Sequence, residues 1–180
     1  MANHVTNIIV IEYPESQKEK ILDIYESMKS ELFTEIYEPV DENLQNTRSW
    51  WEQNIGAKWV RLQDIEEPEE GSFMINLESA WSEVGPLVER IDKITDNECR
   101  IVHQFIDEMP NFFGCRVYES GSMEEMVDWD GHETIENEAM IREKSENVTF
   151  DSDYDRDDWI WNWKWDFVHE AIDPENCEFV

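Results

Sequence analysis

Short runs in which every second residue is apolar alternate along this chain with segments of helical periodicity, and this pattern constrains the fold most. The clearest run is Ser72 to Ala80 (SFMINLESA), which alternates as a half-buried strand does. Four further runs predict strands: Thr6 to Tyr13, Cys99 to Ile106, Phe112 to Tyr118 and Glu124 to Trp129. These five runs together predict a β-sheet.

Two segments have the periodicity of helices. Ser16 opens the capping-box pattern SQKE, and apolar residues then recur at helical spacing, so we expect a helix from about Gln17 to Ile36. Ser82 to Ile94 predicts a second helix, with Pro86 in its first turn. Three intervening segments are expected to be a polar loop, a short helix followed by a strand, and an acidic turn: Val40 to Thr47, Ser49 to Leu62 and Ile65 to Gly71.

The order strand, helix, strand, helix, strand, strand predicts an α+β fold. We expect a ferredoxin-like sandwich, in which an antiparallel or mixed sheet has its helices on one face. Residues 1–130 would form this domain, and residues 131–180 an acidic, aromatic extension that packs on the same body. Residues 133–144 of the extension are expected to be helical; whether the extension is rigid or mobile is left open.

Several short motifs occur in an order that resembles the YubB ferredoxin-like domain family. They are Gly56-Ala57-Lys58-Trp59, Ser79-Ala80-Trp81-Ser82 and DEMPNFFG (Asp107 to Gly114), with Asn3 and Asn7 leading into the first strand. The similarity covers residues 2–130 or so. It departs from the family where Glu83-Val84 replace two prolines. The resemblance implies the fold and a setting on plasmids or bacteriophages, and it implies no enzymatic activity.

The charge of the chain is extreme. Its 180 residues include 44 acidic and 14 basic ones, a formal net charge of -30, whereas solubility alone needs a magnitude of only about 2–8. Residues 119–180 hold 20 of the acids and 4 of the bases. With 12% aromatic residues, the chain is unlike disordered acidic chains. Because phosphate contacts come from Lys and Arg, direct binding to nucleic acid or to an anionic membrane is disfavoured.

The sequence contains no recognisable catalytic or metal-binding motif and no signal for export. There is no apolar run of 18 residues, and Met1 to Tyr13 lacks a signal-peptide core. Cys99, Cys115 and Cys177 show no CxxC spacing, which indicates reduced thiols and a cytoplasmic location, the host cytoplasm if a phage or plasmid encodes the chain. We expect Cys99 and Cys115 to pack, as neighbours across two strands, and His103 to be a packed strand residue. No catalytic residue, metal site or cofactor is predicted.

The segment from Asp151 to Trp165 holds the candidate functional residues of the extension. Its acidic run fails as an EF-hand loop, because Arg156 and Asn162 stand where glycine and the bidentate glutamate belong. The tryptophans that follow alternate with other residues, which predicts a strand with all four indoles on one face: Trp159, Trp161, Trp163 and Trp165. Such a strand would either cover the sheet or offer an aromatic contact surface.

Thirty net charges equal those of about 15 base pairs of duplex DNA. This suggests a protein that binds a basic surface of a nucleic-acid-handling host protein, such as a restriction or CRISPR-like defence protein, and inhibits it by mimicking nucleic acid. The alternatives are a general interaction or regulatory module whose charge serves solubility, and a module that binds Ca²⁺ or Mg²⁺; a homodimer is also possible. The residues expected to bind the partner are Asp151, Asp153, Asp155, Asp157, Asp158, Glu66, Glu67, Glu69, Glu70, Trp159 and Trp161.

Overall fold

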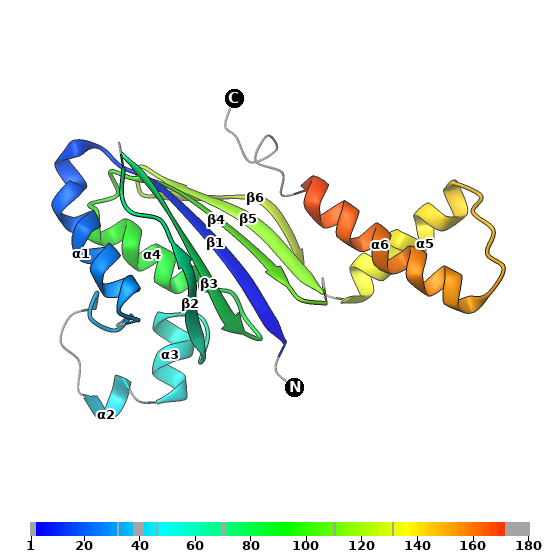
Figure 1. Ribbon diagram of the computed structural model, residues 1–180, viewed down its shortest axis with the longest axis horizontal. Helices are drawn as coiled ribbons and strands as arrows, with labels where there is room; N and C mark the ends of the chain where they lie inside the picture. Colours follow the sequence, from blue (N-terminus) through cyan, green and yellow to red (C-terminus); the bar gives the residue numbers. More distant parts are fainter. Residues whose placement is uncertain are drawn as a thin grey trace.

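The computed structural model describes residues 3–171 except 32, 38–41, 46, 70, 110 and 131. It has an α+β fold built on a six-stranded sheet in the order β2-β3-β1-β4-β5-β6 (Figure 1). All neighbouring strands are antiparallel. The strands are β1 (His4–Glu12), β2 (Val60–Ile65), β3 (Ser72–Ala80), β4 (Arg100–Asp107), β5 (Phe112–Glu119) and β6 (Ser122–Asp130).

Helices connect these strands and follow the last of them. They are α1 (Lys18–Lys29), which a short 3-10 helix (Glu15–Gln17) precedes, α2 (Glu42–Gln45), α3 (Arg48–Asn54), α4 (Gly85–Ile94), α5 (His132–Ser145) and α6 (Asp153–Ala171). The α+β class expected from the sequence is confirmed. The order β2-β3-β1-β4, with α1 and α4 as connections against one face, is consistent with a ferredoxin-like arrangement (Figure 1).

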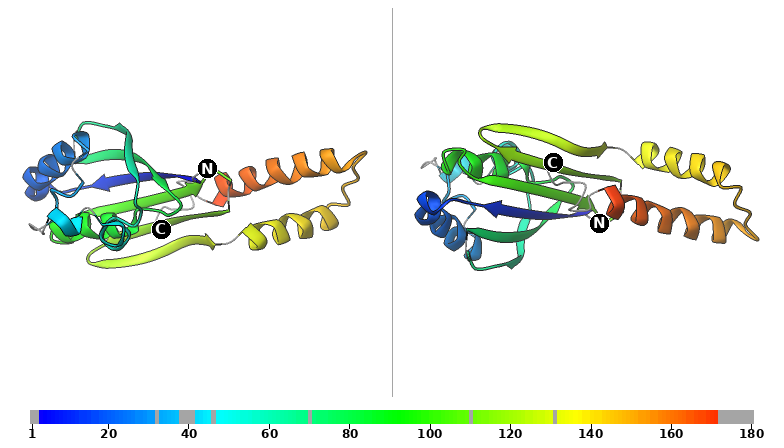
Figure 2. Two further views of the ribbon diagram at one scale, coloured as in Figure 1. Left: turned by 90° about the horizontal axis from the view of Figure 1, so that it is seen from below. Right: turned by 90° about the horizontal axis from the view of Figure 1, so that it is seen from above.

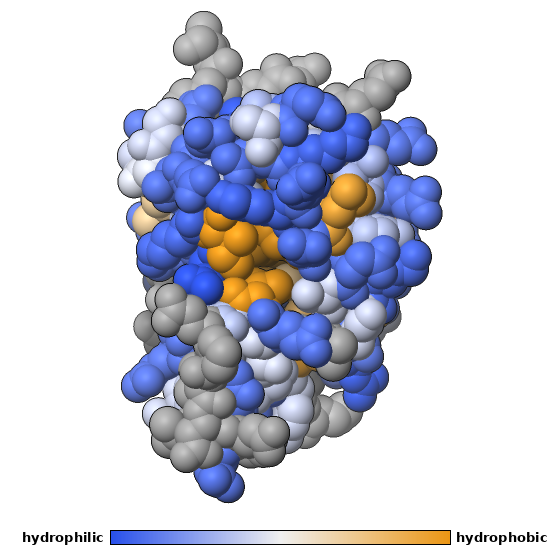
Figure 3. Space-filling model, turned by 90° about the vertical axis from the view of Figure 1, so that its left-hand side faces the viewer, coloured by the Kyte–Doolittle hydropathy of each residue, from blue (hydrophilic) through white to orange (hydrophobic). Residues whose placement is uncertain are grey.

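The main core lies between α1, α4 and one face of the sheet, which we call the helix-covered face. Alternate residues of β1 and β3, such as Ile9 and Ile75, are buried there against Ile24 of α1 and Leu87 of α4. Each such side chain contributes about 1.5–3 kcal/mol by leaving water. A hollow of about 260 Å³ remains between α1 and α4, and its apolar floor is visible among hydrophilic side chains in Figure 3.

A second, smaller core lies on the opposite face of the sheet. Phe113 and Cys115 of β5 are buried there with Ile135 of α5 and Val168 of α6. Cys99 belongs instead to the main core, and Cys115 pairs with Gln104 across β4 and β5. The expectation that Cys99 and Cys115 are cross-strand neighbours is therefore wrong, because the sheet separates the two thiols.

The first helix is shorter than expected. It ends at Lys29, and Glu31 has a φ of 55°, so the chain turns there although Phe33 and Ile36 stay buried in the main core. Because these two residues are buried, the apolar pattern in the sequence continues past Lys29 although the helix does not. The predicted capping box is also wrong, because the hydroxyl of Ser16 donates to the Glu98 carboxylate, 3.1 Å away.

The predicted strand of alternating tryptophans is wrong: these residues belong to α6. The Ser152 hydroxyl caps this helix by accepting the Asp155 N–H at 3.2 Å. Asp153 and Asp155 lie in the first turn, where the helix dipole favours negative charge. Two views show α5 and α6 side by side, projecting as a hairpin beyond the end of the sheet (Figure 2).

Candidate functional site

The predicted acidic residues fall into two groups at opposite ends of the molecule. Glu66, Glu67 and Glu69 are exposed in the turn between β2 and β3, which the bond from the Tyr13 N–H to the Gly71 carbonyl places beside the end of β1. Glu70 lies outside the described residues. The other group lies at the tip of the α5–α6 hairpin, which begins where β6 ends and β1 starts (Figure 1). The structure does not bring the two groups together.

All five acidic residues of the hairpin group are exposed: Asp151, Asp153, Asp155, Asp157 and Asp158. Four of them fall within the first six residues of α6. At a rise of about 1.5 Å per residue, these four carboxylates occupy about 7.5 Å of helix axis, or one per about 2 Å. Duplex DNA carries one negative charge per about 1.7 Å of axis. The charge density at the hairpin tip is therefore close to that of duplex DNA.

Both basic residues of α6 point to α5 and form ion pairs across the hairpin. Arg156 donates to both oxygens of Glu143, with Nε 3.0 Å from Oε1 and Nη2 2.8 Å from Oε2. Lys164 is only 4% exposed, and its Nζ lies 3.4 Å from Oε1 of Glu136. The Arg156 hydrogen bonds hold the pKa of Glu143 below its usual range. Glu143 is thus the main partner of Arg156, and the charges of Asp153 and Asp157 act on the same guanidinium more weakly.

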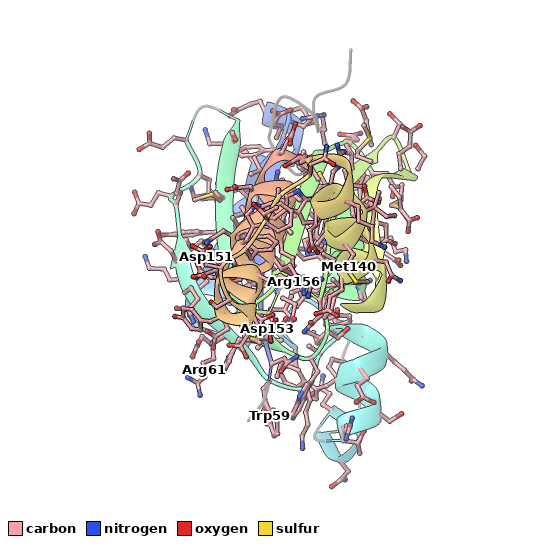
Figure 4. The ribbon with its side chains drawn as sticks, turned by 90° about the vertical axis from the view of Figure 1, so that its right-hand side faces the viewer. Trp59, Arg61, Met140, Asp151, Asp153 and Arg156 are labelled. Carbon is pink, nitrogen blue, oxygen red and sulfur yellow. The ribbon has the colours of Figure 1, made fainter. Side chains whose placement is uncertain are left out.

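Figure 4 looks onto the tip of the hairpin and shows Arg156 between the two helices. A hollow of about 390 Å³ lies beside it, lined by Met140 of α5, by Ile160 and Trp161 of α6, and by Met109 of the β4–β5 turn. Arg156 and Lys164 line the same hollow, so the surface where α5 and α6 face each other is both apolar and charged.

The tryptophans of α6 do not form one aromatic face, because residues two apart lie on opposite sides of a helix. Trp163 stacks on Phe167 with ring centroids 5.0 Å apart, and both pack on the second core. Trp159 is half-buried and contacts Phe150. Trp161 is 39% exposed, so it is the indole of this run most available to a partner.

A second constellation, which the sequence did not reveal, lies on the helix-covered face near the start of β1. Its centre is Arg116 of β5, whose Nη1 lies 2.8 Å from Oε1 of Glu83. The carboxylates of Glu125 and Asp128 lie 3.7 and 3.8 Å from the same guanidinium, and the ring of Phe105 lies beneath it. Four separate segments supply these groups, so only the cross-strand alternation of β5 and β6 could have indicated their meeting.

A buried polar network holds the loop before α4 next to Arg116. The Asn7 side chain accepts the Val84 N–H at 3.1 Å and donates to the Ser79 hydroxyl at 2.9 Å. His103 is fully buried, as expected of a packed strand residue, with Nε2 3.2 Å from Oδ1 of Asn7. Burial, and then the nearby charge of Arg116, lower the pKa of His103 to about 3. The imidazole is therefore neutral at physiological pH.

The three motifs of the family resemblance meet around this constellation. The main chain of Trp81 donates to the Asn3 carbonyl at 2.9 Å. The rings of Trp59 and Trp81 lie 4.9 Å apart, and Gly56 packs against the main chain of Glu83. Phe112, from DEMPNFFG, and Trp81 both line a hollow beside Arg116.

Within the described residues, no three or more His, Cys, Asp or Glu side chains are grouped so that they could hold a metal ion. None of the helices in the described part of the chain combines the length and apolarity needed to cross a membrane.

Comparisons with known proteins find no protein-family model, no curated protein and no solved structure that matches this chain. The resemblance to the YubB ferredoxin-like domain family thus stays a prediction.

Proposed function

We propose that this chain binds the basic surface of a protein that handles nucleic acid and inhibits it by occupying that surface, without catalysis. The observation that carries the proposal is the cluster of exposed aspartates at the tip of the α5–α6 hairpin: Asp151, Asp153, Asp155, Asp157 and Asp158. A hairpin that projects beyond the sheet can enter a groove that the body of the protein cannot (Figure 2).

Both the local density of charge and the long-range attraction of the chain favour contact with a basic surface. Asp153 and Asp157 project from one side of α6, and Asp155 and Asp158 project from the other. A basic groove that flanks the helix can therefore place the Lys and Arg side chains that otherwise bind phosphates against both pairs. The net charge of -30 adds long-range attraction, which raises the association rate with a positively charged surface. Trp161, exposed beside the aspartates, would add an aromatic contact of the kind that anchors interfaces.

The wider setting follows from the family resemblance. We propose a ferredoxin-like body, residues 1–130, that carries the acidic extension, residues 131–180. If the gene belongs to a phage or plasmid, the partner is a host defence protein of the restriction or CRISPR type in the host cytoplasm. The second acidic group, which includes Glu66, Glu67 and Glu69, lies too far from the hairpin tip to share one contact with it, so we assign it a lesser role.

The test is an affinity capture from host lysate with the immobilised chain, at several salt concentrations. We expect capture of a nucleic-acid-binding protein, weakened by 0.5 M salt because polyelectrolyte contacts are screened, and competition by duplex DNA. Neutralising all five hairpin aspartates to Asn should abolish capture. A variant that neutralises only Asp153, Asp155 and Asp157 to Asn should lose most of the capture. The matched control, which also removes three charges, neutralises Glu66, Glu67 and Glu69 to Gln, and it should retain most of the capture.

Equal capture by the two triple variants contradicts the placement of the site on the hairpin. Capture of proteins that bind no nucleic acid favours the alternative, a general interaction or regulatory module whose charge serves solubility. Binding that is unchanged at 0.5 M salt removes the mimicry proposal.

A further inference from the structure

A hollow of about 320 Å³ opens on the helix-covered face, beyond the start of α4. Its lining comes from the loop before α4 and from β4, β5 and β6, and it includes Trp81, Glu83, Phe105, Phe112, Arg116 and Asp128. Asp128 lies four residues before α5, so the hollow and the base of the hairpin share one end of the sheet. The hollow is nevertheless separate from the aspartates at the hairpin tip.

The backbone presents an aromatic ring at the rim of this hollow. Trp81 has a φ of 65°, a conformation that residues with side chains rarely adopt, and its indole is 48% exposed. Trp59, 51% exposed, contacts it at 4.9 Å between ring centroids. An unfavourable backbone conformation that keeps a large apolar ring in solvent is typical of a binding site.

The charge of the hollow is negative although Arg116 lines it. Among the residues that line it, Glu83 and Asp128 face the single guanidinium at 2.8 and 3.8 Å, which leaves one negative charge in excess. Glu125 lies outside the lining and places a third carboxylate 3.7 Å from the same guanidinium. The Gly85 N–H donates to Glu83, and a Cβ at Gly85 would come within 2.8 Å of the Glu83 carboxylate and 3.1 Å of Nη1 of Arg116, so a side chain there would shift both ends of this pair.

We infer that this hollow binds the guanidinium of an arginine side chain on a protein partner. The indole of Trp81 offers a π face to a flat cation, and the excess carboxylates offer acceptors that match its fork of N–H donors. Arg116 already shows this geometry within the chain, with its guanidinium 4.9 Å from the centre of the Phe105 ring. The site goes beyond the proposed function, because it needs neither the hairpin aspartates nor a nucleic-acid-binding partner.

The experiment uses short capped peptides, so that the total charge of the protein does not dominate. Acetyl-Gly-Arg-Gly-amide is titrated against the full chain while the indole N–H signals are followed by NMR, with Trp59→Phe and Trp81→Phe to assign them. We expect a saturable shift of the Trp81 signal, with a Kd of about 1–10 mM for a single side chain. The Trp161 signal should move far less.

Three probes and two variants decide the outcome. The citrulline peptide, a neutral isostere of the arginine peptide, should cause no saturable shift, and the lysine peptide should bind several-fold more weakly. Asp128→Asn should weaken arginine binding at least threefold, whereas Glu66→Gln, an equal loss of charge in the distant turn, should not. Asp128 is exposed, so its variant should keep the native spectrum.

A saturable shift with acetyl-Gly-Glu-Gly-amide would overturn the inference, because Arg116 would then be the recognition group for an anion. Equal shifts with arginine and citrulline, or uniform shifts of all indoles, would also overturn it. Loss of hairpin-dependent capture leaves this result untouched, so the two proposals fail separately.

Discussion

Arg156 of α6 and Glu143 of α5 meet through two parallel hydrogen bonds, of 3.0 Å from Nε to Oε1 and 2.8 Å from Nη2 to Oε2. This ion pair connects the two helices next to the exposed aspartates. The Lys164–Glu136 pair and the second core join the two helices nearer their base. The Arg156–Glu143 pair lies closer to the tip, so it helps to hold the aspartates there in place.

Arg156→Gln should loosen the hairpin tip and raise the pKa of Glu143 toward its ordinary value of 4.5. Since the pKa of Glu143 is lowered in the folded state, the pair stabilises the hairpin above pH 4.5 and loses this effect as the pH falls through the lowered value. NMR titration of the Glu143 carboxyl group checks the shift, and amide exchange checks the loosening. The control is Arg142→Gln, since Arg142 pairs with Glu138 within α5. A Glu143 pKa that stays low in Arg156→Gln would contradict the assigned cause.

The strands could be predicted from the sequence because their signals are local. Ser72 to Ala80 alternates between a buried and a solvent face, and β3 has those bounds. The tryptophan run could not be predicted in this way. Its indoles alternate as a strand would, but they also recur four residues apart, and Trp163 and Phe167 find their partners, Phe113 and Trp129, more than thirty residues earlier. The Ser152–Asp155 cap was a helix signal available in the sequence.

The two candidate sites also differ in how far the sequence could predict them. The exposed aspartates are a run in the sequence, and a charged run predicts exposure. The Arg116 constellation is assembled from the loop before α4, from β4, β5 and β6, and no local pattern links Glu83 to Asp128. Only the register of the sheet, which sets Gly114 opposite Phe105 and Asp128, brings these groups together.

Asn7→Ala should destabilise the fold by about 2–4 kcal/mol, because it leaves the buried Val84 N–H and the His103 Nε2 without their shared acceptor. Urea unfolding followed by tryptophan fluorescence measures the change. The matched control is Asn76→Ala on β3. Within the described part of the chain, Oδ1 of Asn76 has no hydrogen-bond partner, so its loss should cost less than about 1 kcal/mol. Equal effects of the two substitutions would contradict the network's role.

His103 predicts a pH dependence of stability. Its pKa is about 3 in the folded chain, against an ordinary value of 6.5. Below pH 6.5 the His103 imidazole is protonated in the unfolded chain but stays neutral in the folded chain. His103 therefore destabilises the fold increasingly as the pH falls toward 3. His103→Gln removes this effect. The stability difference between the two proteins should change in favour of the variant by at most about 1.4 kcal/mol per pH unit in that window.

Unfolding in urea at pH 7.5 and at pH 5.5 tests this prediction. Protonation of the many carboxylates affects both proteins alike, so only the difference between them reports on His103. A difference that is the same at both values would show that the imidazole titrates normally in the folded chain.

Trp81→Gly separates binding from folding at the arginine hollow. Glycine adopts the φ of 65° freely, which relieves about 1–2 kcal/mol of backbone cost. Against this stand the lost contact with Trp59, about 0.5–1.5 kcal/mol, and the greater entropy of glycine in the unfolded chain, about 0.4–1 kcal/mol. These effects nearly cancel, so the free energy of unfolding should stay within about 1 kcal/mol of the unmodified chain, while binding of the arginine peptide should be lost.

Gly56→Ala is the contrasting substitution at the same place. Gly56 has a φ of 103°, and a Cβ there would overlap the Glu83 carbonyl and the Pro86 ring. We therefore expect a loss of several kcal/mol, since both strain and overlap oppose the native loop. If Trp81→Gly unfolds the chain as severely as Gly56→Ala, then Trp81 is a structural residue, and its exposure needs no partner to explain it. If Trp81→Gly folds normally and still binds the arginine peptide as before, then the peptide does not use the indole.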